Sequence, residues 1–222
     1  MKSVAALRNS LIFSLLTPSE QLRLVALART QTHRPGESIF GMGDEGSSMM
    51  VVQTGEVKIS RPSARGHAIV LAELNPGAVF GEVALLDGGI RSADATASTN
   101  CTLLVFDRRD FLDLLKGNWP LTEAVLKLVC TRLRQADEGL ADLAFFDLPG
   151  RLAKTLLARA RPAPGGGPPQ VSDTQGALAA MAGGSRETVN RTLRKWASSG
   201  LVAIADGRIF LLDRDALARI PE

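Results

Sequence analysis

The sequence of 222 residues predicts an α+β chain with three parts: an N-terminal antiparallel β-roll, a long helix, and a C-terminal winged helix-turn-helix. Three observations predict this fold. Closely spaced β-rich runs, separated by Gly and Pro turns, occupy residues 31 to about 107. A heptad pattern of apolar residues follows. Two short helical patterns and a two-residue hairpin signal then lie near the C-terminus.

The composition is that of a globular protein rather than a disordered or membrane-spanning one. Hydrophobic residues make up 45% of the chain and the mean hydropathy is +0.08. No apolar run approaches the roughly 18 residues of a membrane span, and the N-terminus lacks the features of a signal peptide. Cys101 and Cys130 lie in apolar sequence without CxxC spacing, which predicts buried free thiols. We therefore expect a cytoplasmic protein with no membrane partner.

Charge is distributed unevenly along the chain. Residues 147–222 carry 11 Lys and Arg against 7 Asp and Glu, a net charge of +4. Residues 1–146 carry 15 against 16, a net charge of −1. A basic C-terminal module attached to a larger, near-neutral one is typical of a DNA-binding domain controlled by a sensor domain.

Residues 1–30 are predicted to be helical, because Leu11, Leu15, Leu22, Val25 and Ala26 recur near the helical period. Pro18 begins a second helix in this segment. Turn signals then separate the β-rich runs that predict the strands of the roll, at residues 48–53, 56–60, 68–74 and 102–106.

Residues 108–146 are again helical in pattern and contain an unbroken heptad seam. Its members step along the chain by three and four residues: Leu126, Val129, Leu133, Ala136, Leu140 and Leu143. A strict seam of this kind favours a coiled coil with a second copy of the chain, and hence a homodimer. The alternative is a core helix packed against its own domain.

The long helix is expected to end near Phe145, because Asp147 is a good N-cap and Pro149 is tolerated in the first turn of the next helix. This break is the candidate hinge, and residues 161–170 form a Pro/Gly-rich loop beyond it. The predicted domains are therefore residues 1–117 (the β-roll with N-terminal helices), 118–146 (the dimerisation helix and hinge) and 147–222 (the winged helix-turn-helix).

The helix-turn-helix pattern lies in residues 174–196. A short helix from Thr174 to Met181 is followed by the turn Ala182-Gly183-Gly184. If Ser185 caps the next helix, Val189, Leu193 and Trp196 fall on one face. Apolar runs on both sides of Asp206-Gly207 then predict a hairpin, which completes the wing.

A polar stripe on the second helix combines arginine with a carboxylate: Arg186, Glu187, Asn190, Arg191 and Arg194. An Arg fork matches guanine O6 and N7, and a Glu accepts a hydrogen bond from cytosine N4. A carboxylate on a basic face repels phosphate, so its presence favours base recognition. An ordinary amphipathic surface helix is the alternative.

A second motif runs from Phe80 to Leu86 and continues at Arg91-Ser92-Ala93. Gly81 permits a close backbone approach, and Glu82 supplies acceptors for ribose hydroxyls. Arg91 supplies a fork for a phosphate and Ser92 a hydroxyl donor. This chemistry suits the cyclic phosphate of a small nucleotide, although a surface Glu–Arg pair is the commoner arrangement.

Three motifs in the right order carry a family resemblance that covers essentially the whole chain. The segment from Phe80 to Leu86 with Arg91-Ser92-Ala93 resembles the phosphate-binding cassette of cyclic-nucleotide-binding domains, which are double-stranded β-helices. The segment from Ser185 to Arg191 resembles the recognition helix of the bacterial cyclic AMP receptor protein (catabolite activator)/fumarate-nitrate regulator family. Residues 143–151 are similar to the hinge of that family.

The resemblance implies a homodimeric transcription regulator, not an enzyme, whose effector is a 3′,5′-cyclic mononucleotide, cAMP or cGMP. It implies that Gly81 and Glu82 hold the ribose 2′-hydroxyl, that Arg91 and Ser92 hold the cyclic phosphate, and that the backbone near Val83 and Ala84 completes the site. On double-stranded DNA it implies a palindromic TGTGA-like site. The residues implied there are Arg186, Glu187 and Arg191 for bases, and Thr174, Ser185 and Thr188 for phosphates. RNA polymerase is an implied partner, because residues 161–170 align with a polymerase-contacting loop.

Two positions depart from the family pattern. Where the cyclic AMP receptor protein presents Thr-Ser to the adenine across the dimer, this chain has Ala136 and Asp137. A carboxylate pairs with two donors of guanine but only one of adenine, so Asp137 makes cGMP a possible effector; alternatively it is a solvated coiled-coil charge. The second departure is Ala177, where a Glu often closes a capping box on Thr174.

Other cofactors and functions are disfavoured. Two cysteines cannot supply the four ligands of an iron–sulfur cluster, and His33 and His67 lie in polar, turn-like sequence that predicts solvated loop histidines rather than haem ligands. No nucleophile–base pair or metal-ligand cluster indicates an enzyme. The rival functions are a cyclic-nucleotide-binding regulatory subunit without DNA, and a family member that binds DNA without a cyclic mononucleotide or answers a different effector.

Overall fold

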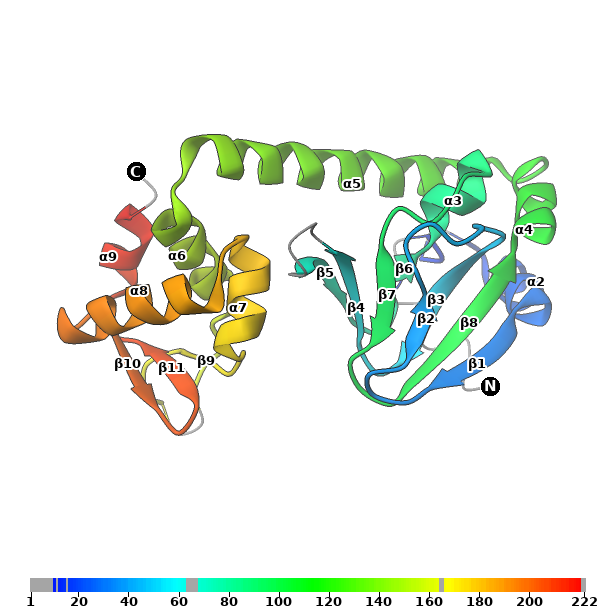
Figure 1. Cartoon of the computed structure of the whole chain (residues 1–222). Helices are drawn as coiled ribbons and strands as arrows, with labels where there is room; N and C mark the ends of the chain where they lie inside the picture. Colours follow the sequence, from blue (N-terminus) through cyan, green and yellow to red (C-terminus); the bar gives the residue numbers. More distant parts are fainter. Residues whose placement is uncertain (1–9, 11, 15, 63–67, 164–165, 221–222) are drawn as a thin grey trace. The chain divides into compact units, whose positions relative to one another are not determined.

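The chain forms two compact units in a computed structural model that describes residues 10, 12–14, 16–62, 68–163 and 166–220. One unit comprises residues 1–62 and 71–134, and the other comprises residues 63–70 and 135–222. Figure 1 labels the helices and strands of both units. Because Leu11 and Leu15 lie outside the described residues, the helical pattern predicted there is not tested.

The first described helix, α2 (Pro18–Leu27), begins where the sequence predicts. The Thr17 side chain accepts a hydrogen bond from the backbone N–H of Glu20, and the Glu20 carboxylate accepts one from the backbone N–H of Thr17 at 2.8 Å. The predicted helical stretch to residue 30 is too long, however, because β1 (Arg29–His33) pairs antiparallel with β8 (Cys101–Asp107). This edge strand consists of polar, mostly exposed residues, so it shows no apolar alternation.

The roll is built from two four-stranded sheets with strand orders β1-β8-β3-β6 and β2-β7-β4-β5. Their remaining strands are β2 (Ser38–Phe40), β3 (Ser48–Thr54), β4 (Val57–Pro62), β5 (Ala68–Leu74), β6 (Val79–Phe80), β7 (Asp94–Ala97) and β8 (Cys101–Asp107). The pairs β3/β8, β3/β6, β2/β7 and β4/β7 are antiparallel. The four predicted strands are confirmed as β3, β4, β5 and β8, whereas β1, β2, β6 and β7 were not predicted.

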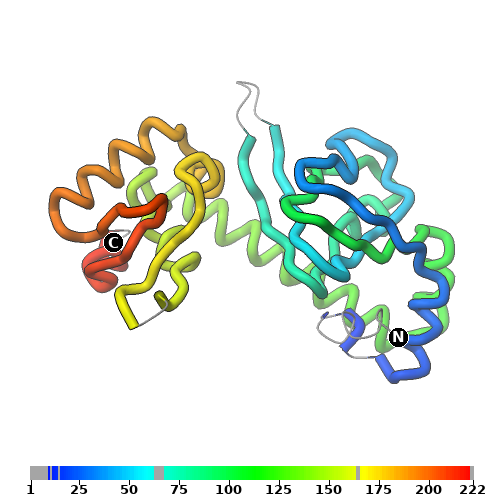
Figure 2. Tube along the Cα trace, turned by 90° about the horizontal axis from the view of Figure 1, so that it is seen from below, coloured from blue at the N-terminus to red at the C-terminus, as the bar shows by residue number. Residues whose placement is uncertain are grey.

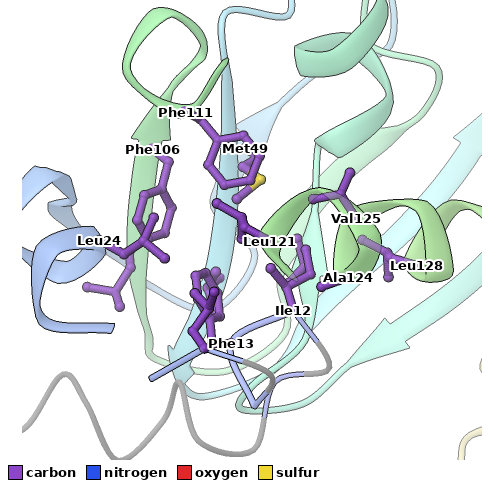
Figure 3. Packing of buried hydrophobic residues seen from close by; sticks show 14 of the residues in the cluster. Ile12, Phe13, Leu24, Met49, Phe106, Phe111, Leu121, Ala124, Val125 and Leu128 are labelled. Carbon is purple, nitrogen blue, oxygen red and sulfur yellow. The ribbon is translucent and has the colours of Figure 1, made fainter. Parts of the chain in front are cut away.

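The core of the roll joins strands and helices through aromatic rings. The ring centroids of Phe13 and Phe106 lie 5.8 Å apart, and Phe106 meets Phe111 edge-on at 6.3 Å. Phe111 comes from α4 (Arg108–Leu115). In Figure 3 these rings lie together with Leu121, Ala124 and Val125 of the long helix. The long helix is therefore part of this core on one face.

The long helix α5 (Trp119–Phe145) buries Leu121, Ala124, Val125 and Leu128. The seam residues lie on another face: the exposed fraction of its five large side chains runs from 40% at Val129 to 66% at Leu140. The alternative in which the seam packs as a core within its own domain is therefore wrong for the chain alone.

Two polar predictions in the first unit need correction. Cys101 is buried as expected, but Cys130 is exposed, because it lies beside the seam on α5 rather than on the face that packs against the roll. His33 is not a solvated loop residue: it ends β1 and its side chain is only 12% exposed. His67 lies outside the described residues.

The second unit has the predicted helix-turn-helix and wing. Its elements are α6 (Leu148–Arg159), β9 (Gln170–Val171), α7 (Gln175–Ala182), α8 (Arg186–Ser198), β10 (Val202–Ala205), β11 (Arg208–Leu211) and α9 (Arg214–Arg219). The β10–β11 hairpin follows directly on α8 (Figure 1 and Figure 2). Its turn has positive φ at Asp206 (51°) and Gly207 (71°), the backbone that a two-residue hairpin requires.

Caps and one close contact fix these helices. Asp147 accepts from the N–H of Gly150 at 2.9 Å and so begins α6 as predicted. The turn between α7 and α8 passes so close to α6 that a Cβ on Gly184 would lie 2.5 Å from Leu148 Cδ1. Leu178, Val189, Leu193 and Trp196 are buried in the core of this unit, whereas Met181 is only half-buried and Ala182 takes its place.

Candidate functional site

The first part of the site is the turn from β6 into the short helix α3 (Glu82–Asp87). Gly81 lies between them in the left-handed region, with φ of 77°. A Cβ at this position would lie 2.6 Å from Arg91 Nη1, so both the backbone conformation and the space require glycine. The predicted role of Gly81 in a close approach thus has a geometric basis.

Arg91 is the central cation of this region, and only 4% of its surface is exposed. Nη1 donates to Gly81 O and Nη2 to Ser48 Oγ, each at 3.0 Å. The guanidinium also lies over the Phe40 ring, 4.3 Å from its centroid. Burial lowers the pKa of Arg91, and the carboxylates of Asp44 and Glu82 raise it. An arginine keeps its charge under these conditions, so the site holds a buried cation.

One nitrogen of this cation has no hydrogen-bond partner. Arg91 Nε is buried and is not bonded to any of the described residues. A buried N–H without an acceptor is costly. The free N–H on a positive charge suits an anionic oxygen such as that of a cyclic phosphate. Ser92, the other predicted phosphate ligand, follows Arg91 directly and is exposed.

Glu82 is the acceptor side of the site and is 6% exposed. Its Oε1 lies 3.5 Å from Arg132 Nε, and Arg132 Nη2 donates to Val79 O at 3.0 Å. Arg132 was not predicted as a site residue, because it lies on α5, 50 positions after Glu82 in the sequence. The signal that points to it is its place one turn after Leu128, on the face of α5 that packs against the roll.

The rest of the predicted binding segment follows the same turn. Ala84 is buried, whereas Val83 is 48% exposed. A Cβ on Gly46 would lie 2.0 Å from Ala84 Cβ, so the loop that contains Gly46 closes directly on α3. The sequence pattern missed Gly46, Ser48 and Phe40, because each is brought to the site from a distant part of the roll.

Asp137 lies in the second unit, exposed on α5 and without a partner among the described side chains. Its heptad position is next to Ala136 in the seam. The structure thus leaves its carboxylate available.

The second part of the site is α8. Ser185 caps it as predicted: its Oγ accepts from the N–H of Thr188 at 3.2 Å, and the two hydroxyls lie 2.9 Å apart. The apolar face is buried, and the side chains of Arg186, Glu187, Arg191 and Arg194 are exposed. These four make no hydrogen bond or ion pair with the described residues. The predicted polar stripe therefore exists as a free surface.

Asn190 differs from the rest of the stripe. It is half-buried, and its Nδ2 donates to Gln175 Oε1 at 2.7 Å. Gln175 is the first residue of α7, which Thr174 caps by accepting from the N–H of Ala177 at 3.1 Å. As expected from Ala177, this cap has no reciprocal Glu.

Comparisons with known proteins give one family match for the roll and another for the helix-turn-helix. Residues 30–118 match the cyclic nucleotide-binding domain family, and residues 150–220 match the Crp-like helix-turn-helix domain family. The CRP-like cAMP-activated global transcriptional regulator of Mycobacterium tuberculosis is 32% identical over 94% of this chain and 95% of its own. The cyclic AMP receptor protein of Thermus thermophilus is 34% identical over 96% of this chain and 98% of its own. The chain belongs to the cyclic AMP receptor protein (Crp) family.

Solved structures support the same fold. The crystal structure of the Thermus thermophilus catabolite activator protein is 34% identical, covers 96% of this chain and 98% of its own, and has a TM-score of 0.58. The c-di-GMP-responsive regulator CLP of Xanthomonas campestris has a TM-score of 0.80, with 89% of this chain and 100% of its own covered. At 22% identity, this second likeness concerns the fold alone. The chain is thus a cyclic-nucleotide-responsive, DNA-binding transcription regulator of a family that is not enzymatic.

The junction between α5 and α6 is held by Arg151 of α6. Its Nη1 donates to Phe146 O at 2.7 Å and its Nε to Ala182 O at 2.9 Å. One guanidinium thereby joins the residue that follows α5 to the last residue of α7. Lys154 adds an ion pair with Asp142 at 2.5 Å. The end of α5 is therefore fastened to the helix-turn-helix.

The described part of the chain has neither a metal-binding cluster nor a membrane-spanning helix. Three or more His, Cys, Asp or Glu side chains do not gather anywhere in it as a metal ion requires. Its helices include none that is long and apolar enough to cross a membrane.

Proposed function

We propose that this Crp-family regulator is a homodimer that binds a 3′,5′-cyclic mononucleotide and, in that state, a palindromic TGTGA-like DNA site. The observation that carries the effector is the buried Arg91, whose Nε lacks an acceptor among the described residues, beside the buried carboxylate of Glu82. A cation with a free donor next to an acceptor matches the phosphate and the ribose hydroxyl of one small ligand.

The ligand contacts follow from this pair. Arg91 Nε and the hydroxyl of Ser92 would donate to the cyclic phosphate, and Glu82 would accept from the ribose 2′-hydroxyl. Gly81 and the backbone of Val83 and Ala84 would close the site around the ligand. The contact of Arg132 with Glu82 supports this arrangement, because it holds the carboxylate in place and balances its charge.

The seam of α5 supports a dimer. Five large apolar side chains at heptad positions are 40–66% exposed in the single chain, on a face of the helix that does not pack against the roll. A second copy in a parallel coiled coil would bury them. Sedimentation should give a dimer, and replacing Leu133 and Leu140 by Lys should give a monomer. Glu138→Lys, at an exposed position away from the seam, is the matched control and should stay dimeric.

The next question is whether the cyclic nucleotide carries adenine or guanine. We propose that Asp137 of one subunit meets the base bound by the other, where its carboxylate would pair with two donors of guanine or one of adenine. Relatives named as cAMP-activated favour cAMP, whereas Asp137 favours cGMP.

Calorimetry with cAMP and cGMP, on wild type and on Asp137→Ala, separates these ligands. Weaker cGMP binding with unchanged cAMP binding in the variant would support the guanine contact. Absence of heat with either nucleotide in the wild type would instead indicate a family member that answers another effector.

On DNA, we propose that Arg186, Glu187 and Arg191 read bases and that Thr174, Ser185 and Thr188 contact phosphates. The support is that the three charged side chains are exposed and free of protein partners among the described residues. Ligand would shift the population of dimers towards the arrangement in which the two copies of α8 fit one DNA spacing. A shift assay with an inverted repeat of TGTGA, with and without nucleotide, tests this. Equal binding to scrambled DNA would contradict it.

We also propose RNA polymerase as a partner of the loop at residues 161–170. Its base is closed by two backbone hydrogen bonds between Arg161 and Gln170, at 2.9 and 2.8 Å. The described residues of the loop are largely exposed. Transcription in vitro with a variant shortened within the loop should lose activation while DNA affinity is kept.

A further inference from the structure

The hydrogen bond between Asn190 and Gln175 joins the two helices of the helix-turn-helix at the edge of the recognition surface. Asn190 Nδ2 donates to Gln175 Oε1 at 2.7 Å. Asn190 lies one turn after Arg186 and directly before Arg191, so it borders the side chains assigned to base contacts. It is also half-buried rather than enclosed.

The bond holds the Asn190 side chain against α7. A primary amide has two N–H donors and one carbonyl acceptor. Gln175 Oε1 accepts from one of these donors. The second Nδ2–H and Oδ1 have no other partner among the described residues. One donor beside one acceptor therefore remains for a ligand.

Adenine is the base that matches this pair of groups in the major groove. It presents N7 as an acceptor and its N6 amino group as a donor, and Asn contacts the two together. Guanine presents two acceptors and cytosine only a donor. An unrestrained Asn adapts to these bases by turning its amide over, whereas Asn190 can turn only if the Gln175 amide turns with it or the bond between them breaks.

Gln175 has the position to act as the support. It is the first residue of α7 and follows Thr174, the cap of that helix. Backbone N–H groups at such an end favour a DNA phosphate. Gln175 Nε2 keeps its donors, since the bond to Asn190 uses only Oε1. A phosphate bound there would hold Gln175, and Gln175 would hold Asn190.

We propose that Asn190 is a specificity-determining residue that selects adenine in the half-site, and that Gln175 is the positioning residue that makes this selection strict. The proposal rests on the proposed DNA-binding function and deepens it. It adds a base contact to those of Arg186, Glu187 and Arg191.

The test is a measurement of base preference at every position of a randomised half-site, using the full-length protein with cAMP and, in parallel, with cGMP. The wild type should select adenine at one position, and Asn190→Ala should lower that preference about tenfold while the other positions keep theirs. Asn190→Asp, which can only accept, should move the preference at that position towards cytosine. An unchanged adenine preference in Asn190→Ala overturns the proposal.

Two variants of Gln175 separate its two contacts. Gln175→Glu keeps an acceptor for Asn190 but loses the donors to phosphate, so affinity should fall for all sequences while the adenine preference stays. Gln175→Leu removes the acceptor as well, so the preference should also weaken. Equal preference in Gln175→Leu and wild type overturns the positioning role.

Two further outcomes separate failure of this proposal from failure of the proposed DNA-binding function. If the wild type selects a palindrome and only unfolding stability changes in the variants, the pair is a structural link between α7 and α8 and this proposal alone fails. If the wild type selects no sequence with either nucleotide, the proposed function fails with it. Circular dichroism of each variant confirms that its helices are formed.

Discussion

Arginine and glutamate serve both halves of this protein, under opposite conditions. In the roll, Arg91 and Glu82 are 4% and 6% exposed, and each contacts other protein groups. On α8, Arg186, Glu187 and Arg191 are exposed and form no hydrogen bond or ion pair with other described side chains. The roll thus holds its charges in place through protein contacts, whereas we expect α8 to order its charges only when DNA binds. We therefore expect residues of the first kind to contribute to folding and to binding, and residues of the second kind to binding alone.

The largest effect should come from Arg91→Ala. Cyclic nucleotide affinity should fall roughly 100-fold because the charge facing the phosphate is lost. The free energy of unfolding should also fall by about 1–3 kcal/mol, since Gly81 O and Ser48 Oγ lose a buried donor. Calorimetry and urea unfolding measure the two. Exposed Arg109→Ala is the control, and unchanged nucleotide affinity in Arg91→Ala would contradict the assignment.

The packing around α3, which begins at Glu82, should be nearly as sensitive. Gly46→Ala should destabilise the fold by about 1–3 kcal/mol, because its Cβ would fall 2.0 Å from Ala84 Cβ. Gly139→Ala is the matched control: no atom lies within 4 Å of the new methyl group, so this change within α5 should stabilise by about 0.5–1 kcal/mol. Thermal unfolding checks both, and equal stability of the two variants would show that the loop around Gly46 adapts.

A smaller and more selective effect is expected for Glu187→Ala. Preference at one C·G pair of the half-site should fall about tenfold. Non-specific DNA binding should strengthen, since a carboxylate facing phosphates is removed. The free energy of unfolding should stay within about 0.5 kcal/mol of the wild type. Binding of Glu187→Ala and wild type to DNA with single base changes measures this preference. If the variant keeps the wild-type preference at every position, Glu187 makes no base contact.

The smallest effect should be that of the cap of α8. Ser185→Ala removes the acceptor for the N–H of Thr188 and should cost about 1 kcal/mol of unfolding free energy. Ser185→Gly should cost only a few tenths of a kcal/mol and serves as the control. If urea unfolding gives the same value for both variants, the cap does not stabilise the helix as described.

Elements with a chemical marker at their ends could be predicted from the sequence. Ser185, Asp147 and Asp206-Gly207 each fix a helix start or a turn through local bonds or backbone conformation, and the structure has all three. β1 has no such marker, because an exposed edge strand of polar residues lacks apolar alternation. Its strand character comes from pairing with β8, which lies some 70 residues away and leaves no local signal.

The site shows the same limit. Gly81, Glu82 and Arg91 lie within one short segment, so their types and spacing predict a shared site. Arg132 meets Glu82 only because α5 packs against the roll, and Ser48 of β3 meets Arg91, 43 positions later, only in the folded roll. The exposed Cys130 illustrates the reverse case: apolar neighbours in sequence suggested burial, but only Leu128 packs against the roll, whereas Val129 belongs to the exposed seam of α5.

Two contacts at the end of α5 join its last turn to α6 and so limit where that helix can bend. Arg151 bonds to Phe146 O and Lys154 pairs with Asp142, so everything from Asp142 onwards is coupled to α6. On the other side, Leu128 and Arg132 are fastened to the roll. Between these anchors, no side chain from Gln135 to Ala141 forms a hydrogen bond or ion pair with the described residues, and Gly139 lies in that stretch. Any bending between the anchors must therefore be absorbed by about two turns of helix, the same length that carries Asp137.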